Sequence, residues 1–307
     1  MTLEPRDAGA FLGLPPEASD SERARVHVLP IPFEATVSYG GGAAGGPAAL
    51  LEASRQVELY DRDFDAEPAL AYGIHTHPPV MFPEGGTPAD AVARIARRVA
   101  AIARPGRLLL SLGGEHTASV GVFDGLARAL GGTFAVVHLD AHADLRDAYE
   151  GEALSHACAL RRIAGHPACG RIWQLGIRSV CAEEMAYIRA NPGKVRIWFA
   201  ETMADGAWRE ELRLGVAGRR VVVTFDVDAL DPSVVPGTGT PEPDGLAWRQ
   251  ALAVADVVAG SAASVAALDC VETAPAPGLH YSEFNVAKLL YGMLNRFCPL
   301  HPRGTSG

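Results

Sequence analysis

Short apolar runs alternate with longer amphipathic stretches along most of the chain. The runs, rich in Val, Ile and Leu, predict strands at residues 26–30, 108–112, 134–139, 172–175, 195–199, 221–225 and 266–270. Helical periodicity predicts helices at 48–54, 88–103, 117–130, 158–163, 182–190, 204–214, 246–260 and 282–297. Strands that alternate with helices are typical of βαβ units and of a mostly parallel sheet. The run 221–225 is apolar on both faces, which indicates a strand buried between two helix layers.

The same pattern predicts one domain. No internal repeat and no Ser/Gly-rich linker interrupts the 307 residues, so we expect a single domain over 1–307, with residues 1–22 as an irregular N-terminal extension. The Gly-rich stretch 40–46 indicates a loop. It is not a phosphate-binding loop, because no Gly-Lys-Ser/Thr follows it.

Composition excludes several classes of protein. The net charge of −9 argues against a nucleic-acid partner, since phosphates need a basic surface, and it is compatible with a small cationic substrate. The five cysteines are odd in number and form no Cys-x-x-Cys pair, which argues against a disulfide framework and against a zinc–thiolate site. The first 21 residues lack an apolar signal core and no run is long enough to cross a bilayer, so we expect a cytoplasmic protein without a membrane partner.

Acidic and imidazole side chains follow three of the predicted strands. In an open α/β sheet, ligands bind beyond the carboxyl ends of the strands, where these segments would meet. Alternate residues of an extended segment also point the same way. The candidate metal ligands are His116 after the first of these strands, Asp140, His142 and Asp144 after the second, and Asp226 and Asp228 after the third.

Four carboxylates and two imidazoles suit two divalent ions. Hard oxygen donors with some nitrogen favour Mn²⁺ over thiolate-seeking ions, and two ions about 3.5–4 Å apart can lower the pKa of a shared water molecule. Taken singly, an Asp-x-Asp after a strand often caps a turn, and His116 would cap the helix that follows it. Three unpaired polar groups beside a buried strand, however, would be costly without a partner. The sequence therefore predicts a two-metal hydrolase.

At these residues the chain resembles the ureohydrolase family, which includes arginase and agmatinase, and it is most like agmatinase. The resemblance covers nearly the whole chain. It is carried by Leu-Gly-Gly-Glu-His-Thr at 112–117, His-Leu-Asp-Ala-His-Ala-Asp at 138–144, Thr-Phe-Asp-Val-Asp-Ala-Leu-Asp-Pro at 224–232, Pro-Gly-Thr-Gly-Thr-Pro at 236–241 and Asp-Cys-Val-Glu at 269–272. It implies a three-layer α/β/α sandwich whose central, mostly parallel sheet has about eight strands.

The resemblance also implies a role for each ligand. Two Mn²⁺ per chain would be bound, one by His116 and Asp144 and the other by His142 and Asp228, with Asp140 and Asp226 bridging them. A bridging hydroxide would attack a guanidinium carbon and release urea and an amine.

Further residues of the implied site would handle the substrate. Glu272 would bind the guanidinium through paired, charge-assisted hydrogen bonds. Glu272 and Asp144 would both be catalytic residues. His156 would pass a proton to the departing amine, because an imidazole titrates near neutrality. Thr240 would contact the substrate or shape its turn.

The substrate is less closely defined by the sequence. The Asn residues with which arginases bind the amino-acid end of arginine are absent from the 145–156 loop, which looks agmatinase-like. We therefore expect agmatine to be cleaved to putrescine. Glu150 or Glu152 would pair with a distal amine, as in agmatine or aminopropylagmatine, whereas Arg146 would favour guanidinobutyrate or another guanidino acid. Ala157 follows the histidine where Gly is more usual.

Two further expectations come from the resemblance. Family members are commonly trimers or hexamers, so we expect a homo-oligomer. A non-catalytic scaffold on the same fold is the alternative from another class, and the presence of all six ligand positions with His156 and Glu272 disfavours it.

Overall fold

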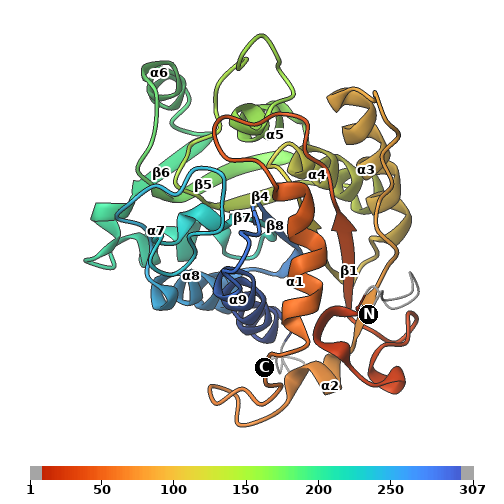
Figure 1. Ribbon diagram of the computed structural model, residues 1–307. Coiled ribbons are helices and arrows are strands. Elements are labelled where there is room, and N and C mark those ends of the chain that lie inside the picture. Colours follow the sequence, from red (N-terminus) through yellow and green to blue (C-terminus); the bar gives the residue numbers. More distant parts are fainter. Residues whose placement is uncertain (1–8, 299–307) are drawn as a thin grey trace.

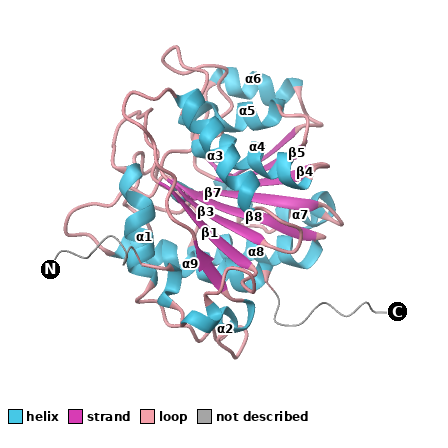
Figure 2. Ribbon diagram, turned by 90° about the vertical axis from the view of Figure 1, so that its right-hand side faces the viewer, coloured by secondary structure: helices cyan, strands magenta, loops and turns pink. Residues whose placement is uncertain are grey.

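A parallel sheet of eight strands runs through the centre of the computed structural model, which describes residues 9–298 (Figures 1 and 2). The strands follow one another across the sheet in the order β2-β1-β3-β8-β7-β4-β5-β6. Every pairing between neighbours is parallel. The strands are β1 (Val26–Ile31), β2 (Ile74–Thr76), β3 (Leu108–Gly113), β4 (Phe134–Leu139), β5 (Cys169–Ile177), β6 (Val195–Phe199), β7 (Arg220–Asp226) and β8 (Ser264–Val271).

Helices cover both faces of this sheet, as Figure 2 shows most clearly. One apolar core lies between the sheet and α1, α7, α8 and α9, and a second lies between the sheet and α3, α4 and α5. The predicted three-layer α/β/α sandwich is therefore confirmed. The helices are α1 (Gly46–Ser54), α2 (Pro68–Tyr72), α3 (Pro88–Ile102), α4 (Ala118–Leu130), α5 (Ala159–Gly165), α6 (Ala182–Ala190), α7 (Trp208–Val216), α8 (Trp248–Ser261) and α9 (Tyr281–Phe297).

The central strand β7 illustrates how the sequence produces these layers. Val221, Val223 and Phe225 point into the core beneath α7 to α9, whereas Val222 points into the core beneath α3 to α5. Side chains of a strand alternate between the two faces, so a strand covered on both sides is apolar at most positions. The run at 221–225 meets that requirement except at Thr224, whose buried hydroxyl is hydrogen-bonded to Asp269.

A few elements differ from the prediction. The edge strand β2 and the five-residue α2 were not expected. Helix α7 begins at Trp208 rather than at residue 204, because Gly206 has a φ of 75° that a helix cannot contain. In the predicted N-terminal extension, residues 1–8 lie outside the described part of the chain, and short 3₁₀ helices form at Phe11–Gly13 and Pro16–Ala18.

The strand order has a direct consequence for the predicted ligands. Strands β3, β8, β7 and β4 are consecutive in the sheet, so the segments that follow them share one edge. Within residues 9–298, no helix is long and apolar enough to cross a membrane.

Candidate metal centre

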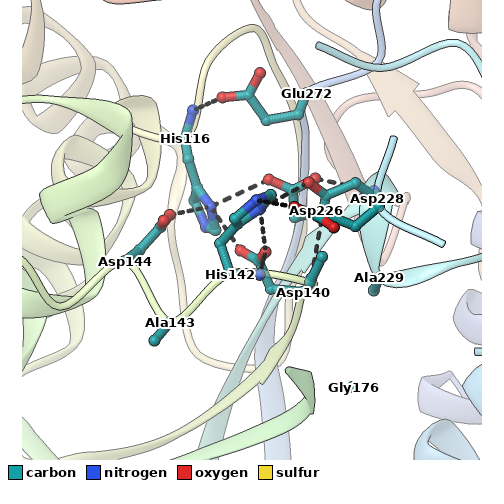
Figure 3. Close-up of polar contacts among 12 residues, drawn as sticks. His116, Asp140, His142, Ala143, Asp144, Gly176, Asp226, Asp228, Ala229 and Glu272 are labelled. Atoms are coloured by element: carbon teal, nitrogen blue, oxygen red, sulfur yellow. Dashed lines mark hydrogen bonds and ion pairs between the residues drawn. The ribbon is translucent and has the colours of Figure 1, made fainter. Parts of the chain in front are cut away.

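The six predicted ligands meet at the carboxyl edge of the sheet, as Figure 3 shows. His116 lies between β3 and α4, and its Nδ1 is 2.9 Å from an Asp144 carboxylate oxygen. The same nitrogen is 3.2 Å from Asp140 Oδ2 and 3.4 Å from Asp226 Oδ2. One imidazole nitrogen thus faces oxygens delivered by two other strands.

A second group of ligand atoms adjoins the first. His142 Nδ1 is 2.9 Å from Asp228 Oδ2 and 3.6 Å from Asp140 Oδ1. Asp140 therefore turns one oxygen toward each histidine and links the two halves of the cluster. Asp226 contacts the His116 half, and its other oxygen accepts the backbone N–H of Asp228 at 3.0 Å.

The chemistry of the cluster fits two divalent cations. His116 is buried, yet its Nδ1 has no hydrogen-bond partner among the described residues. Burial, together with the charges of Asp228 and Asp140, raises the pKa of Asp226 well above its usual range. Burial and the Asp140 charge also raise the pKa of Asp228. Crowded buried carboxylates are unfavourable without compensating charge, and hard oxygen and imidazole donors suit ions of the Mn²⁺ type.

Neighbouring hydroxyls orient His116 for such an ion. Asp269, buried on β8, accepts the Thr224 hydroxyl at 3.2 Å, the Ser111 hydroxyl at 2.5 Å and the Ser119 hydroxyl. Because the Thr224 proton is directed at Asp269, Thr224 Oγ1 accepts from His116 Nε2–H, 3.0 Å away. This places the His116 lone pair on Nδ1, toward the carboxylates. The sequence offered no sign of this role beyond the position of Asp269 in the 269–272 motif.

His138 supports the cluster without being a ligand. Its ring lies near His116, and its Nε2 is 2.7 Å from Asp140 Oδ2. The Gln174 amide, which also donates to the Ala143 carbonyl, lies 3.0 Å from His138 Nδ1 and donates to it. The His138 proton is therefore on Nε2 and is shared with Asp140, so that nitrogen has no lone pair for a metal.

Two residues of the centre adopt a left-handed backbone that is uncommon outside glycine. Asp144 has a φ of 52° and Glu272 a φ of 64°. In Asp144 this departs from the regular extended segment that the spacing predicted. Such conformations cost free energy and persist where the surrounding structure holds them, commonly at functional sites.

Glu272 extends beside the cluster from the end of β8. Its carboxylate accepts the backbone N–H of His116 at 2.7 Å, and its own N–H donates to the Gly114 carbonyl at 2.8 Å. Burial raises the pKa of Glu272 to about 8. A substrate cation placed against this carboxyl group would favour its ionised form.

The cluster lies at the wall of a cavity of about 290 Å³. Of the predicted substrate-contacting residues, His156, Thr240, Arg146 and Glu272 line this cavity. Glu152 is not among the lining residues, and its carboxylate instead accepts the backbone N–H of Leu154 at 2.8 Å.

The 34–40 loop, between β1 and α1, closes another side of the cavity. Its Thr36 and Ser38 hydroxyls lie 2.9 Å and 2.7 Å from the two ring nitrogens of His156. No pattern in the sequence indicates these contacts, because the loop has no periodicity and lies about 120 residues from His156.

Comparison with known proteins agrees with this geometry. The chain matches the sequence profile described as the Arginase family over residues 24–294. It is 37% identical over 278 residues to the N(1)-aminopropylagmatine ureohydrolase of a Synechocystis species, covering 88% of each chain. It is 33% identical over 255 residues to the agmatinase of Bacillus subtilis, covering 83% of this chain and 85% of that one. Among solved structures, the agmatine ureohydrolase of Thermoplasma volcanium is similar with a TM-score of 0.78 and 28% identity, covering 92% of both chains.

Proposed function

This chain belongs to the arginase family, and we propose that it is a manganese-dependent ureohydrolase that cleaves a guanidino amine to urea and a smaller amine. One observation carries the proposal: a buried cluster of Asp and His ligands lies beside the Glu272 carboxylate at the wall of one cavity. At a coarser level, the chain is an arginase-family hydrolase that acts on guanidino groups.

Different residues of the site would serve different steps of the reaction. Two Mn²⁺ ions, when bound, would supply Lewis acidity and lower the pKa of a water molecule that attacks the guanidinium carbon. Asp140 and the other ligands would fix the ions, while Glu272 would bind the planar guanidinium through paired hydrogen bonds and orient its carbon. His156 would supply the proton that the departing amine needs.

We propose a guanidino amine, agmatine or its N1-aminopropyl derivative, as the substrate. The relatives named above act on such amines, according to their names. The charges of the cavity support the same class, because the carboxylates that remain apart from the proposed metal ligands and Glu272 outnumber its guanidinium group and favour a cationic tail. These remaining carboxylates are Glu34 and Glu184, against Arg146.

Arg146 supports a second candidate, a guanidino acid such as 4-guanidinobutyrate. Its guanidinium carbon lies 5.2 Å from the centre of the Tyr149 ring, and both side chains line the cavity. A guanidinium in that position would pair with a substrate carboxylate. This is the specific feature that argues against a purely cationic substrate.

A substrate panel separates the two candidates. We expect kcat/KM of the manganese-loaded enzyme to be highest for agmatine or aminopropylagmatine, and lower for 4-guanidinobutyrate and arginine. A preference for 4-guanidinobutyrate that Arg146→Ala reverses would establish the guanidino acid instead. Arg209→Ala is the matched control, because Arg209 also lies over an aromatic ring but on α7, outside the cavity lining.

A further inference from the structure

A buried carboxylate outside the ligand set reaches the 34–40 loop. Glu115 precedes His116 and is 1% exposed. Its Oε2 accepts the backbone N–H groups of Ala35 at 2.6 Å and Thr36 at 2.5 Å, and its Oε1 lies 2.9 Å from the Thr36 hydroxyl. Three donors surround this carboxylate, and an ionised carboxylate can only accept.

The hydrogen bonds of the Thr36 hydroxyl determine which ring nitrogen of His156 is protonated. The single hydroxyl proton of Thr36 is directed at Glu115, so Thr36 Oγ1 can only accept from other groups. Two nitrogens of His156 approach that oxygen, the backbone N at 3.1 Å and Nδ1 at 2.9 Å. His156 Nδ1 must therefore carry a proton. Ser155 Oγ, 3.4 Å from the same nitrogen, is compatible as a second acceptor.

The other ring nitrogen is left with its lone pair. His156 Nε2 lies 2.7 Å from Ser38 Oγ, and Tyr149 Oη lies 3.4 Å from the same serine oxygen. The single Ser38 hydroxyl proton can be donated to either group, and the shorter contact is the one to His156. Ser38 and Tyr149 both line the cavity, and the Tyr149 ring meets the imidazole edge-on, with 5.6 Å between ring centres. The unprotonated nitrogen therefore faces the side from which a substrate would arrive.

We propose that Glu115 is a positioning residue that acts through Thr36 to hold His156 in the Nδ1–H tautomer, so that Nε2 is the atom that takes up and gives the proton. The inference rests on the proposed function for the use of that proton. As the oxygen of the attacking water forms its bond to the guanidinium carbon, Nε2 accepts one of the water protons and then delivers it to the amine nitrogen. That nitrogen keeps the electron pair of the guanidinium C–N bond as the bond breaks. The second water proton leaves the carbon-bound oxygen for the released amine by way of solvent, which gives urea and an ammonium group. The Nδ1 proton stays with Thr36 throughout.

Isosteric variants separate this role from mere shaping of the loop. In Glu115→Gln the amide oxygen can still accept the two backbone N–H groups, but the amide nitrogen would donate to Thr36 Oγ1. The Thr36 hydroxyl would then have to donate to His156 Nδ1, which reverses the tautomer. Thr36→Val removes the link, and Thr36→Ser retains it. Asp20→Asn is the control, because Asp20 also accepts two backbone N–H groups, from Glu22 and Arg23, but does not line the cavity.

The tautomer can be observed directly. Full-length protein labelled with ¹⁵N-histidine and loaded with diamagnetic Mg²⁺ gives ring ¹⁵N shifts that distinguish protonated from unprotonated nitrogens, with the His156 signals assigned from their loss in His156→Asn. We expect a protonated Nδ1 in the wild type, in Thr36→Ser and in Asp20→Asn, and a protonated Nε2 in Glu115→Gln. A neutral wild-type ring protonated at Nε2 would overturn the proposal, whatever the activity of any variant.

Kinetics provide the second readout. With manganese content matched by elemental analysis, Glu115→Gln and Thr36→Val should lose roughly 10²-fold or more in kcat with little change in KM, and Thr36→Ser should stay near wild type. Equal kcat in Thr36→Val and Thr36→Ser would refute the role of the hydroxyl, even if Glu115→Gln did not fold. If no guanidino compound yields urea with the wild type, the proposed function fails, whereas the ring shifts still decide the tautomer.

Discussion

The same arrangement of side chains orients two histidines of the site. In each case a buried carboxylate takes the proton of a threonine, and the threonine oxygen then accepts from the imidazole. Thr224 bonds to Nε2 of His116 and leaves Nδ1 for a metal ion, whereas Thr36 bonds to Nδ1 of His156 and leaves Nε2 for the substrate. The threonine that bonds to one ring nitrogen therefore determines which nitrogen keeps its lone pair for a metal ion or a proton.

The Asp269 network predicts a metal-binding defect without the loss of a ligand. In Asp269→Asn an amide replaces the carboxylate to which three hydroxyl groups donate. The Thr224 hydroxyl then loses the acceptor that directs its proton away from His116. We expect affinity for the metal at the His116 half to fall about 10–100-fold. Manganese titration measures this change. The control is Asp231→Asn in an exposed turn, and an equal effect in both variants would contradict the prediction.

Removal of the linking carboxylate should have the larger effect. Asp140 faces both His116 and His142, so Asp140→Ala takes an acceptor from each half and leaves the cations under-compensated. We expect fewer than two bound ions per chain and loss of urea release. Elemental analysis and a urea assay test this, with the exposed Asp147→Ala as control. Two ions and full turnover in Asp140→Ala would refute the assignment.

The convergence of the candidate ligands could be predicted from the sequence, but the residues that support them could not. His116, Asp140 and Asp226 each follow or end a recognisable apolar run, and the common edge of a parallel sheet brings such positions together. Glu115 and Thr36 meet only because the fold places a periodicity-free loop beside the end of β3. Their contact spans 79 residues of sequence and depends on side-chain geometry that no local pattern encodes.

At the scale of the elements, segments with a clear apolar run or helical pattern were predicted well, and short segments without one were not. The predicted strand 134–139 coincides with β4, and the predicted helix 182–190 coincides with α6. Strand β2 was missed because it has three residues at the sheet edge, two of them His75 and Thr76, which form no apolar run. Pairing with β1 rather than its own composition makes this segment a strand.

Three segments of the chain lie close together at the end of β3, so we expect Gly114 not to tolerate a larger side chain. A Cβ on Gly114 would lie 2.0 Å from the Phe33 carbonyl oxygen, so Gly114→Ala must displace either the 34–40 loop or His116. We expect a loss of stability on the order of 1–3 kcal/mol together with weaker metal binding. Gly165→Ala, where a Cβ meets nothing within 4 Å, should affect neither. Thermal unfolding and metal titration of both variants test the difference, and equal behaviour would argue against this packing.

At the scale of the whole molecule, assembly stays a prediction. We expect a closed homo-oligomer, a trimer or hexamer, because closed symmetric assemblies are the usual state of soluble homo-oligomers. The apolar segment 284–294 does not supply the interface, since side chains such as Val286, Leu290 and Leu294 are buried in the core beneath α9. Light scattering at micromolar concentration tests the prediction, and a monomer would contradict it without affecting the proposed enzyme activity.

The ionisation of the metal-free centre predicts how the stability of the whole molecule depends on pH. Burial and neighbouring carboxylates raise the pKa of Asp226 and Asp228, and burial raises that of Glu272 to about 8. Although burial alone would lower it, contact with Asp140 and Asp228 raises the pKa of His142 to about 12. The folded, metal-free protein thus holds protons that the unfolded chain releases between about pH 4 and pH 7.

Because the folded state binds more protons than the unfolded state, a rise in pH favours unfolding. The metal-free protein should therefore become less stable as the pH rises above about 4, and the stabilisation that comes from Glu272 should be lost by about pH 8. Metal binding displaces the same protons and is favoured as the pH rises. The difference in Tm between manganese-loaded and chelator-treated protein should therefore widen from about pH 6 to about pH 8. Calorimetry of both forms measures it, and Asp140→Ala should abolish most of the difference. A difference that stays constant or narrows with rising pH would mean that these protons are not the ones that metal binding displaces.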